Sequence, residues 1–181
     1  MNLIRPSQYA CVSYPAAKFS NESKAKMITE ISSLTAISPI DGRYARACHP
    51  LRAYFSEYAL MRFRVYVELY WFQTLFSEGI VCQDKSTIAQ ILAEKPFMDS
   101  IFDSFSTNDG QRVKEIEKTT NHDVKAIEYF LKEKFAQNKV LAQHKEYLHF
   151  SCTSADINNL AYGLMLHHSF KDVILPQIRS L

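Results

Sequence analysis

Glycine is scarce in this sequence, which contains 4 glycines among 181 residues, far fewer than the average usage of about 7% would give. Alternating runs of valine, isoleucine and threonine, which are typical of β-strands, are scarce as well. Hydrophobic residues still make up 47% of the chain, which is enough for a packed core. The sequence therefore predicts an all-α protein and excludes a chain that is disordered throughout.

An excess of charge of one sign is also missing. The 21 Lys and Arg residues stand against 19 Asp and Glu residues, interspersed along the chain, so no basic face indicates nucleic-acid binding. Cys11, Cys48, Cys82 and Cys152 form no C-x-x-C pair and no zinc-like spacing with histidine. No apolar run approaches the roughly 18 residues of a membrane span, and no secretory signal is evident. We expect a cytoplasmic protein with no metal, no cofactor, and neither nucleic acid nor membrane as a partner.

Residues 1–27 differ from the rest of the chain. This segment has two prolines, no sustained apolar period and no acidic residue before Glu22. We interpret it as a flexible extension ahead of an internal start at Met27. A transit peptide would share the lack of acidic residues, but the segment has only one arginine, Arg5.

Apolar periodicity predicts a series of helices in the remainder. A long buried helix is expected from Phe55 to Phe76, stopped at Gly79, with one apolar face made of Leu60, Val67, Trp71 and Leu75. Pro96 is expected to stop a shorter helix. The shorter helices are predicted at Ser86–Lys95, Phe97–Phe105 and Asp109–Lys118.

Two further helices carry clear apolar stripes. The first ends near Phe135 and has the stripe Val124, Ile127, Leu131 and Phe135. The second begins about Ser154, runs toward Pro176 and has the stripe Ile157, Leu160, Ala161, Leu164 and Met165. Each begins with a short polar segment, and these two segments hold the most informative residues of the sequence.

The first polar segment is Thr120-Asn121-His122-Asp123. Thr120 and Asp123 have the spacing of a capping box, which places His122 in the first turn of a helix. A helix N-terminus carries partial positive charge, so an imidazole there is well placed to meet an anion. The alternative is a simple helix cap with an exposed histidine.

The second polar segment repeats this arrangement. Thr153 and Asp156 have capping spacing, Ser154 adds a hydroxyl and His149 lies just upstream. Earlier in the chain, Arg43 and Tyr44 follow a predicted Asp41-Gly42 turn, where an arginine can donate two hydrogen bonds to a phosphate or carboxylate. Together the three segments predict an anion-binding site.

The segments "SLTAISPIDGRY", "FSEYALMRFRVYVELYWFQ", "IEKTTNHDVKAIEYFLKEK" and "HFSCTSADINNLAYGLML" resemble, in that order, the N-terminal part of bacterial-type adenylosuccinate lyases. The resemblance spans about Ser32 to the end of the sequence. It implies the fold of the fumarase/aspartase superfamily, with an N-terminal helical domain at residues 28–139 and the start of the central helical bundle at residues 140–181. Residues 1–27 lie outside it.

The resemblance implies the β-elimination of fumarate from adenylosuccinate and from succinylated aminoimidazole carboxamide ribotide, in a homotetramer. It implies substrate-binding roles for seven residues and an auxiliary role for His149. The seven are Arg43, Tyr44, Asn121, His122, Asp123, Thr153 and Ser154.

The family's "THG" and "SSxMPxKxNP" segments, which supply the catalytic histidine and serine, do not occur in these 181 residues. Elimination needs a positioned base and an acid. We therefore expect a truncated or split lyase that is inactive alone and associates with itself or with a missing C-terminal part. The alternative is a non-catalytic helical module that uses the same fold to bind a partner.

Overall fold

The computed structural model of the chain describes residues 32–181. The extension expected at residues 1–27 lies outside the described residues. Across residues 32–181 the regular elements are helices and no strand occurs, so the prediction of an all-α protein is confirmed. The chain divides into two compact units, Met1–Arg46 and Ala47–Leu181, and the second unit contains nearly all of the described helices. The predicted division into domains near residue 140 stays a prediction.

The elements in chain order include short 3-10 turns and one π-helical turn among the α-helices. They are α2 (Ala45–Cys48), η1 (His49–Leu51), α3 (Arg52–Phe55), α4 (Glu57–Ser77), α5 (Lys85–Ala93), α6 (Lys95–Asp103), α7 (Thr107–Thr120), α8 (Asp123–Phe135), η2 (Leu141–Gln143), η3 (Lys145–Tyr147), α9 (Ser154–Ser169), η4 (Phe170–Ile174) and α10 (Leu175–Arg179).

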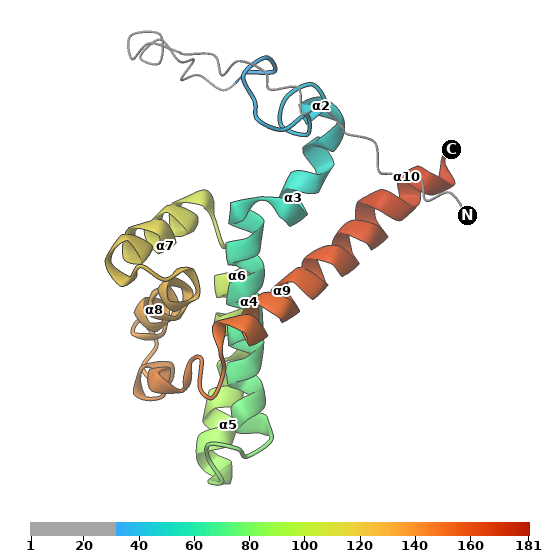
Figure 1. Cartoon of the computed structure of the whole chain (residues 1–181). Coiled ribbons are helices and arrows are strands. Elements are labelled where there is room, and N and C mark those ends of the chain that lie inside the picture. Colours follow the sequence, from blue (N-terminus) through green and yellow to red (C-terminus); the bar gives the residue numbers. More distant parts are fainter. Residues whose placement is uncertain (1–31) are drawn as a thin grey trace, which may run out of the picture. The chain divides into compact units, whose positions relative to one another are not determined.

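Helix α4 is the central element of the second unit, with α8 and α9 packed against it (Figure 1). The Ser56 side chain caps its start by accepting a hydrogen bond from the Ala59 N–H. Its end is followed by Gly79 at a positive φ of 65°, a conformation that glycine adopts without strain. The predicted long helix with its stop at Gly79 is therefore confirmed, and Glu57 is its first residue.

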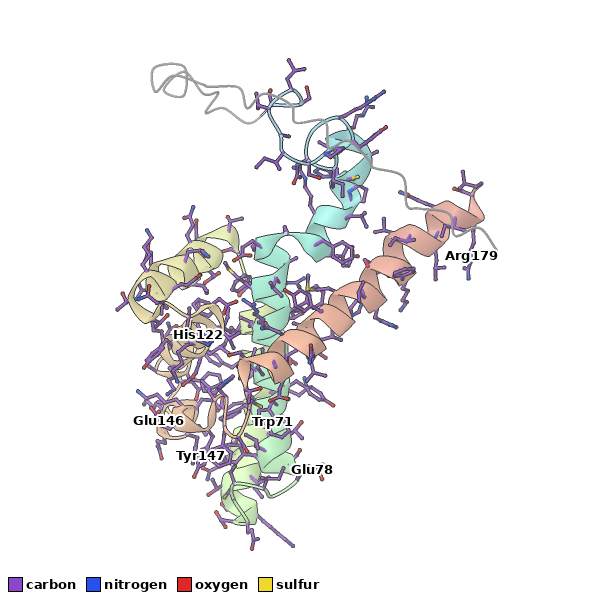
Figure 2. All side chains as sticks on the ribbon, in the orientation of Figure 1. Trp71, Glu78, His122, Glu146, Tyr147 and Arg179 are labelled. Atoms are coloured by element: carbon purple, nitrogen blue, oxygen red, sulfur yellow. The ribbon has the colours of Figure 1, made fainter. Side chains whose placement is uncertain are left out.

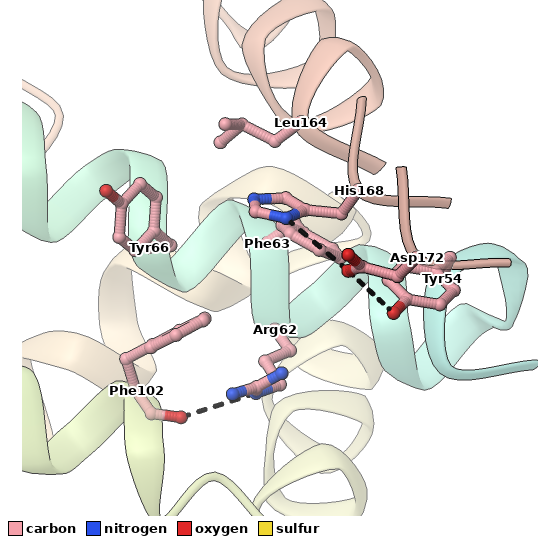
Figure 3. A pocket seen from close by; sticks show the side chains of 8 residues that line it. All are labelled: Tyr54, Arg62, Phe63, Tyr66, Phe102, Leu164, His168 and Asp172. Carbon is pink, nitrogen blue, oxygen red and sulfur yellow. Dashed lines mark hydrogen bonds and ion pairs between the residues drawn. The ribbon is translucent and has the colours of Figure 1, made fainter. Parts of the chain in front are cut away.

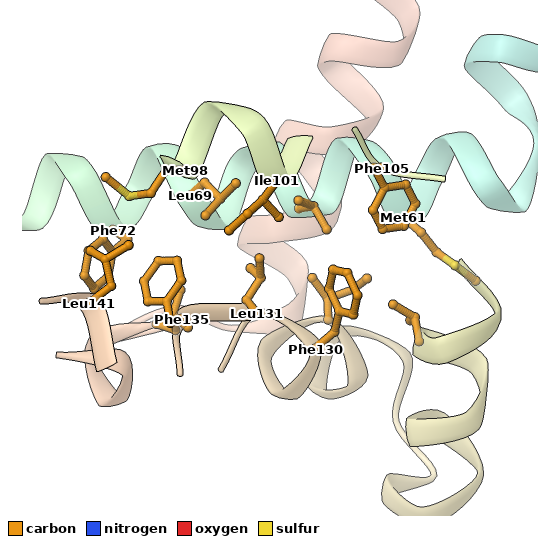
Figure 4. Packing of buried hydrophobic residues seen from close by; sticks show 14 of the residues in the cluster. Met61, Leu69, Phe72, Met98, Ile101, Phe105, Phe130, Leu131, Phe135 and Leu141 are labelled. Atoms are coloured by element: carbon orange, nitrogen blue, oxygen red, sulfur yellow. The ribbon is translucent and has the colours of Figure 1, made fainter. Parts of the chain in front are cut away.

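Two hydrophobic clusters lie along α4. In the larger one, Leu69, Phe72 and Phe76 of α4 meet residues from α5 to α8, with the Phe72 ring edge-on to Phe135 (Figure 4). The smaller cluster joins α4 to the start of α8 and to one face of α9 through Phe63, Val67, Val124, Ile157, Ala161 and Met165. Because α4 is covered on more than one side, a single amphipathic face does not describe it.

The stripe predicted on α8 is confirmed, since Val124, Ile127, Leu131 and Phe135 are all buried. The stripe on α9 needs a correction. Ile157, Ala161 and Met165 are buried against α4, but Leu160 is 59% exposed. These three buried residues thus pack against α4 within the chain itself.

Two predicted helix boundaries were also wrong. Helix α5 ends at Ala93, and Pro96 lies in the first turn of α6, where its missing N–H costs nothing. The Thr120–Asp123 capping box does not form, because Thr120 is still the last residue of α7 and Asn121 ends that helix in the left-handed conformation. His122 itself is the cap of α8.

Pro176 does not end the last helical segment. It lies in the first turn of α10, directly after the π-helical turn η4. Proline has no N–H to donate and its ring crowds the carbonyl four residues earlier, which favours a wider turn just before it. Among residues 32–181, no helix has both the length and the apolar character needed to cross a membrane.

Candidate functional site

The first turns of α8 and α9 meet at His122 and Ser154. The Nε2 atom of His122 lies 3.2 Å from Ser154 Oγ, while its Nδ1 accepts a hydrogen bond from the Lys125 N–H at 3.2 Å. An imidazole nitrogen that accepts a hydrogen bond carries no proton. In the neutral His122 ring the proton is therefore on Nε2, which donates to Ser154 Oγ. The structure therefore brings together two of the residues predicted from separate segments. Figure 2 labels His122 at the start of α8.

Arg64 of α4 forms hydrogen bonds to residues of both α8 and α9. Its side chain is 4% exposed. Its Nη2 donates to Asp123 Oδ2 at 2.6 Å, and its Nε donates to Asn158 Oδ1 at 2.8 Å. Because the planar guanidinium has fixed donor directions, these two bonds set the separation of α8 and α9 at the site.

Both carboxylate oxygens of Asp123 accept hydrogen bonds from other groups of this chain. Its Oδ1 accepts from the Val124 N–H at 2.9 Å, and its Oδ2 accepts from Arg64. Partial burial raises the pKa of Asp123, but the Val124 N–H and the Arg64 charge outweigh burial and hold it below its ordinary value. Asp123 thus remains a carboxylate at neutral pH and orients the start of α8.

The hydroxyl groups of the adjacent residues Thr153 and Ser154 have different hydrogen-bond partners. The Thr153 hydroxyl accepts from the Asp156 N–H and donates to Asp156 Oδ2, and Asp156 Oδ2 also accepts the Thr153 N–H at 2.7 Å. The capping box predicted at α9 is therefore confirmed. Since Thr153 is committed to the cap, Ser154 is the hydroxyl at this helix start whose own proton is free to reach a ligand.

His149 is held by a residue that sequence analysis did not select. Its Nδ1 lies 2.6 Å from Oε1 of Glu68, which is fully buried on α4. The Glu68 hydrogen bond raises the pKa of His149, and burial opposes this only in part. His149 has a positive φ of 60°, a region that few non-glycine residues occupy.

Arg64 and Glu68 are four residues apart, and Trp71 follows three residues later, so the three share one face of α4. Trp71 Nε1 donates to the Phe150 carbonyl at 2.9 Å. We call Arg64, Glu68 and Trp71 the polar stripe of α4. A signal was available, because two charged residues four apart inside a strongly apolar helix indicate specific partners.

Asn121 ends α7, whereas Arg43 and Tyr44 lie in the first unit, which is described by itself. Asn121 has a φ of 50°, a conformation that asparagine tolerates, and its backbone N–H donates to the Glu117 carbonyl. Arg43 and Tyr44 belong to the first unit, where the guanidinium carbon lies 5.6 Å from the tyrosine ring centroid. Their roles in binding stay predictions.

The turn before Arg43 depends on Gly42. A Cβ atom at this position would lie 3.1 Å from the Ala36 Cβ and 3.2 Å from the Ser33 carbonyl oxygen. Only glycine fits such a close approach without a shift of the backbone. The predicted Asp41-Gly42 turn thus presents Arg43 and Tyr44 as exposed neighbours.

A separate cavity of about 390 Å³ is lined by residues of α3, α4, α6, α9 and η4 (Figure 3). In it the Arg62 guanidinium lies 4.1 Å from the Phe102 ring centroid, and the Tyr54 hydroxyl donates to Asp172 at 3.1 Å. None of the predicted site residues lines this cavity. Within residues 32–181, no group of three or more His, Cys, Asp and Glu residues is arranged to hold a metal ion.

Two helix N-termini, a histidine–serine contact and a buried arginine thus lie together on a helical scaffold. Residues 42–181 match the family model described as lyase, and the chain belongs to this lyase family. Its relatives include adenylosuccinate lyases. Those of Escherichia coli strain K12 and Haemophilus influenzae are each 49% identical to it over 152 residues.

The adenylosuccinate lyase of Vibrio cholerae is 46% identical over 152 residues. These matches cover 84% of this chain but 33% of each relative. The chain thus spans about a third of the length of the curated relatives it matches, and it corresponds to an N-terminal portion of them. The resemblance found in the sequence is confirmed.

Proposed function

We propose that this chain supplies part of the substrate-binding site of a cytoplasmic adenylosuccinate lyase, which eliminates fumarate from adenylosuccinate and from succinylated aminoimidazole carboxamide ribotide. The observation that carries the proposal is the 3.2 Å contact between His122 and Ser154 at two converging helix starts. Both substrates carry a phosphate and two carboxylates. Helix N-termini and neutral N–H and O–H donors are suited to such groups.

The chain's own residues have binding and orienting roles in this proposal. Ser154 accepts from His122 and offers its hydroxyl proton to an anionic oxygen, while Arg64 and Asp123 fix the two helices. Arg43 and Tyr44 are proposed to bind the nucleotide, and Asn121 and Thr153 to shape the segments around it. The acid and base that elimination requires come from sequence other than these 181 residues, in an assembly of subunits.

Complementation tests this function. The 181-residue chain is co-expressed with the part of the Escherichia coli enzyme that lies outside the matched third, and fumarate release is followed by ultraviolet absorbance. We expect no turnover from the chain alone and measurable turnover from the complex. If a purified, associated complex has no activity, the proposal is wrong.

His122→Asn is the variant that separates binding from folding. Asparagine is a good helix cap, so the free energy of unfolding should change by less than about 1 kcal/mol. Its short side chain replaces the imidazole that contacts Ser154, so kcat/KM of the complex should fall at least about tenfold, or roughly 1.4 kcal/mol. His122→Ala is the comparison, because it removes the cap as well. If kcat/KM is unchanged in His122→Asn, His122 acts only as a helix cap and does not bind substrate.

A further inference from the structure

Glu68 is an unusual residue for the middle of a packed helix. It is 0% exposed, and its neighbours Val67 and Leu69 on α4 are both buried apolar residues. Its Oε1 contacts His149, but its Oε2 is buried with no hydrogen-bond partner among the described residues. A buried carboxyl group with half of its acceptors unused costs stability. Packing alone therefore does not explain Glu68.

The segment that Glu68 holds is also strained. His149 and Ser151 have positive φ values of 60° and 59°, and each left-handed non-glycine residue costs about 1 kcal/mol or more. Two side chains of α4 hold this segment, Glu68 through the His149 ring and Trp71 through the Phe150 carbonyl. The buried carboxyl group on α4 and the strained loop are thus joined by a single hydrogen bond, the one between Glu68 and His149.

That hydrogen bond determines which imidazole nitrogen of His149 is available to a ligand. Because Nδ1 is committed to Glu68, Nε2 is the ring nitrogen left for a ligand, and the His149 side chain is 18% exposed. The same carboxyl group favours the doubly protonated ring, in which Nε2 is a charged donor. His149 also lies four residues before Thr153, the cap of α9.

We propose that Glu68 is a positioning residue that orients His149 through Nδ1, so that Nε2–H donates to an anionic oxygen of the substrate. This rests on the proposed function for the identity of the ligand. The orientation itself depends only on groups of this chain. The relation is that of a carboxylate that fixes the tautomer and direction of a histidine acting on a ligand.

Several other groups act on the same imidazole. Glu128 and Lys125 of α8 interact with it electrostatically, with opposite effects on its pKa, and its charge acts on Asp156 of α9. Burial raises the pKa of Cys152 to about 11, so this neighbouring thiol is uncharged at neutral pH. Of these groups, only Glu68 is hydrogen-bonded to the ring.

The first test is an NMR titration of His149 in the 181-residue chain labelled with ¹⁵N-histidine. In Glu68→Gln, which keeps the side-chain shape and removes its charge, the pKa of His149 should fall and the tautomer balance should shift. Glu128→Gln is the matched control, since Glu128 is 4% exposed but lies beside Lys125 and Lys132, and it should cause a smaller fall. Equal falls in the two variants would overturn the positioning role.

Stability against pH gives a second readout. A histidine whose pKa is raised by folding stabilises the protein fully below its unfolded value, about 6.5. That contribution is lost as the pH rises through the higher folded pKa. The Tm difference between wild type and Glu68→Gln should therefore shrink as the pH rises above about 6.5. Glu68→Met serves if Glu68→Gln does not fold, because an apolar side chain of similar size suits the buried position.

The complemented enzyme connects the pair to catalysis. For wild type, kcat/KM should fall as the pH rises through the pKa of His149, and in Glu68→Gln this fall should begin at lower pH. Unchanged pH profiles together with an unchanged titration would overturn the proposal. A shifted titration without any complementation would support Glu68 as a positioning residue and contradict only the proposed function.

Discussion

Helix α8 begins at a histidine that caps it with its own ring, whereas α9 begins at a capping box between Thr153 and Asp156. Both starts read in the sequence as a hydroxyl residue followed three positions later by aspartate. In α9 the aspartate closes the box, but in α8 Asp123 turns to Arg64. The same local pattern thus serves a purely local cap in one helix and a long-range contact in the other.

This difference determines which side chains remain for a ligand. At α9 the cap uses Thr153 and leaves Ser154, while at α8 the cap uses one nitrogen of His122 and leaves the other. The two remaining groups are the ones that meet at 3.2 Å. Capping chemistry therefore determines which pair of side chains is left outside the caps, and Arg64 holds the two helix starts that carry this pair.

Arg64→Met should have the largest effect, because it removes the group that joins the two helix starts. Asp123 and Asn158 would each lose a hydrogen bond to a charged partner. Since the Asp123 side chain is 46% exposed and can be rehydrated, we expect a loss of about 2 to 3 kcal/mol in the free energy of unfolding. Urea unfolding of the 181-residue chain measures it.

Arg112→Met is the matched control for this variant. Arg112 also bonds two side chains, those of Glu115 and Glu133, but its own side chain is 49% exposed. Exposed ion pairs contribute little, so its loss should be below about 1 kcal/mol. Similar losses for Arg64 and Arg112 would mean that Arg64 does not join the helix starts as described.

The features that were predicted correctly depend on local periodicity. The buried stripe of α8 and the Thr153–Asp156 box need only residues within one helix. The polar stripe of α4 depends on contacts that span 59 to 94 residues of sequence. Such pairings are set by how α4 packs against the starts of α8 and α9, which no local pattern specifies.

The error at Thr120 has a similar cause. A motif of threonine followed by aspartate three residues later cannot reveal that the preceding helix still includes the threonine. Asn121, which accepts the left-handed conformation, was the available signal for a helix end one residue before His122. With that signal used, His122 becomes the residue at the cap position, and histidine is an uncommon choice there.

Thr153→Ala compared with Thr120→Ala tests this correction and should give the next largest effect. Loss of the Thr153 cap should cost about 1 kcal/mol of unfolding free energy. Thr120 only donates to the His122 carbonyl at an exposed position, so its replacement should cost less than about 0.5 kcal/mol. Thr153→Ser should restore most of the loss, since serine caps equally well. If Thr120→Ala lowers the free energy of unfolding as much as Thr153→Ala does, Thr120 acts as a helix cap and the correction is wrong.

Ser154→Ala should have the smallest effect on stability and still separate the two helix starts. Ser154 follows the cap of α9 and takes no part in the box, so the free energy of unfolding should change by less than about 0.5 kcal/mol. The Nε2 proton of His122 would lose its acceptor, and its exchange with water should become faster in ¹⁵N-histidine NMR spectra. The Nδ1 nitrogen should keep the shift of an acceptor, because the Lys125 N–H still bonds to it. Ser154→Thr is the control, since it retains a hydroxyl and should keep the slow exchange. If exchange in Ser154→Ala stays as slow as in wild type, the contact between the two helix starts is not a hydrogen bond, and the two caps act independently.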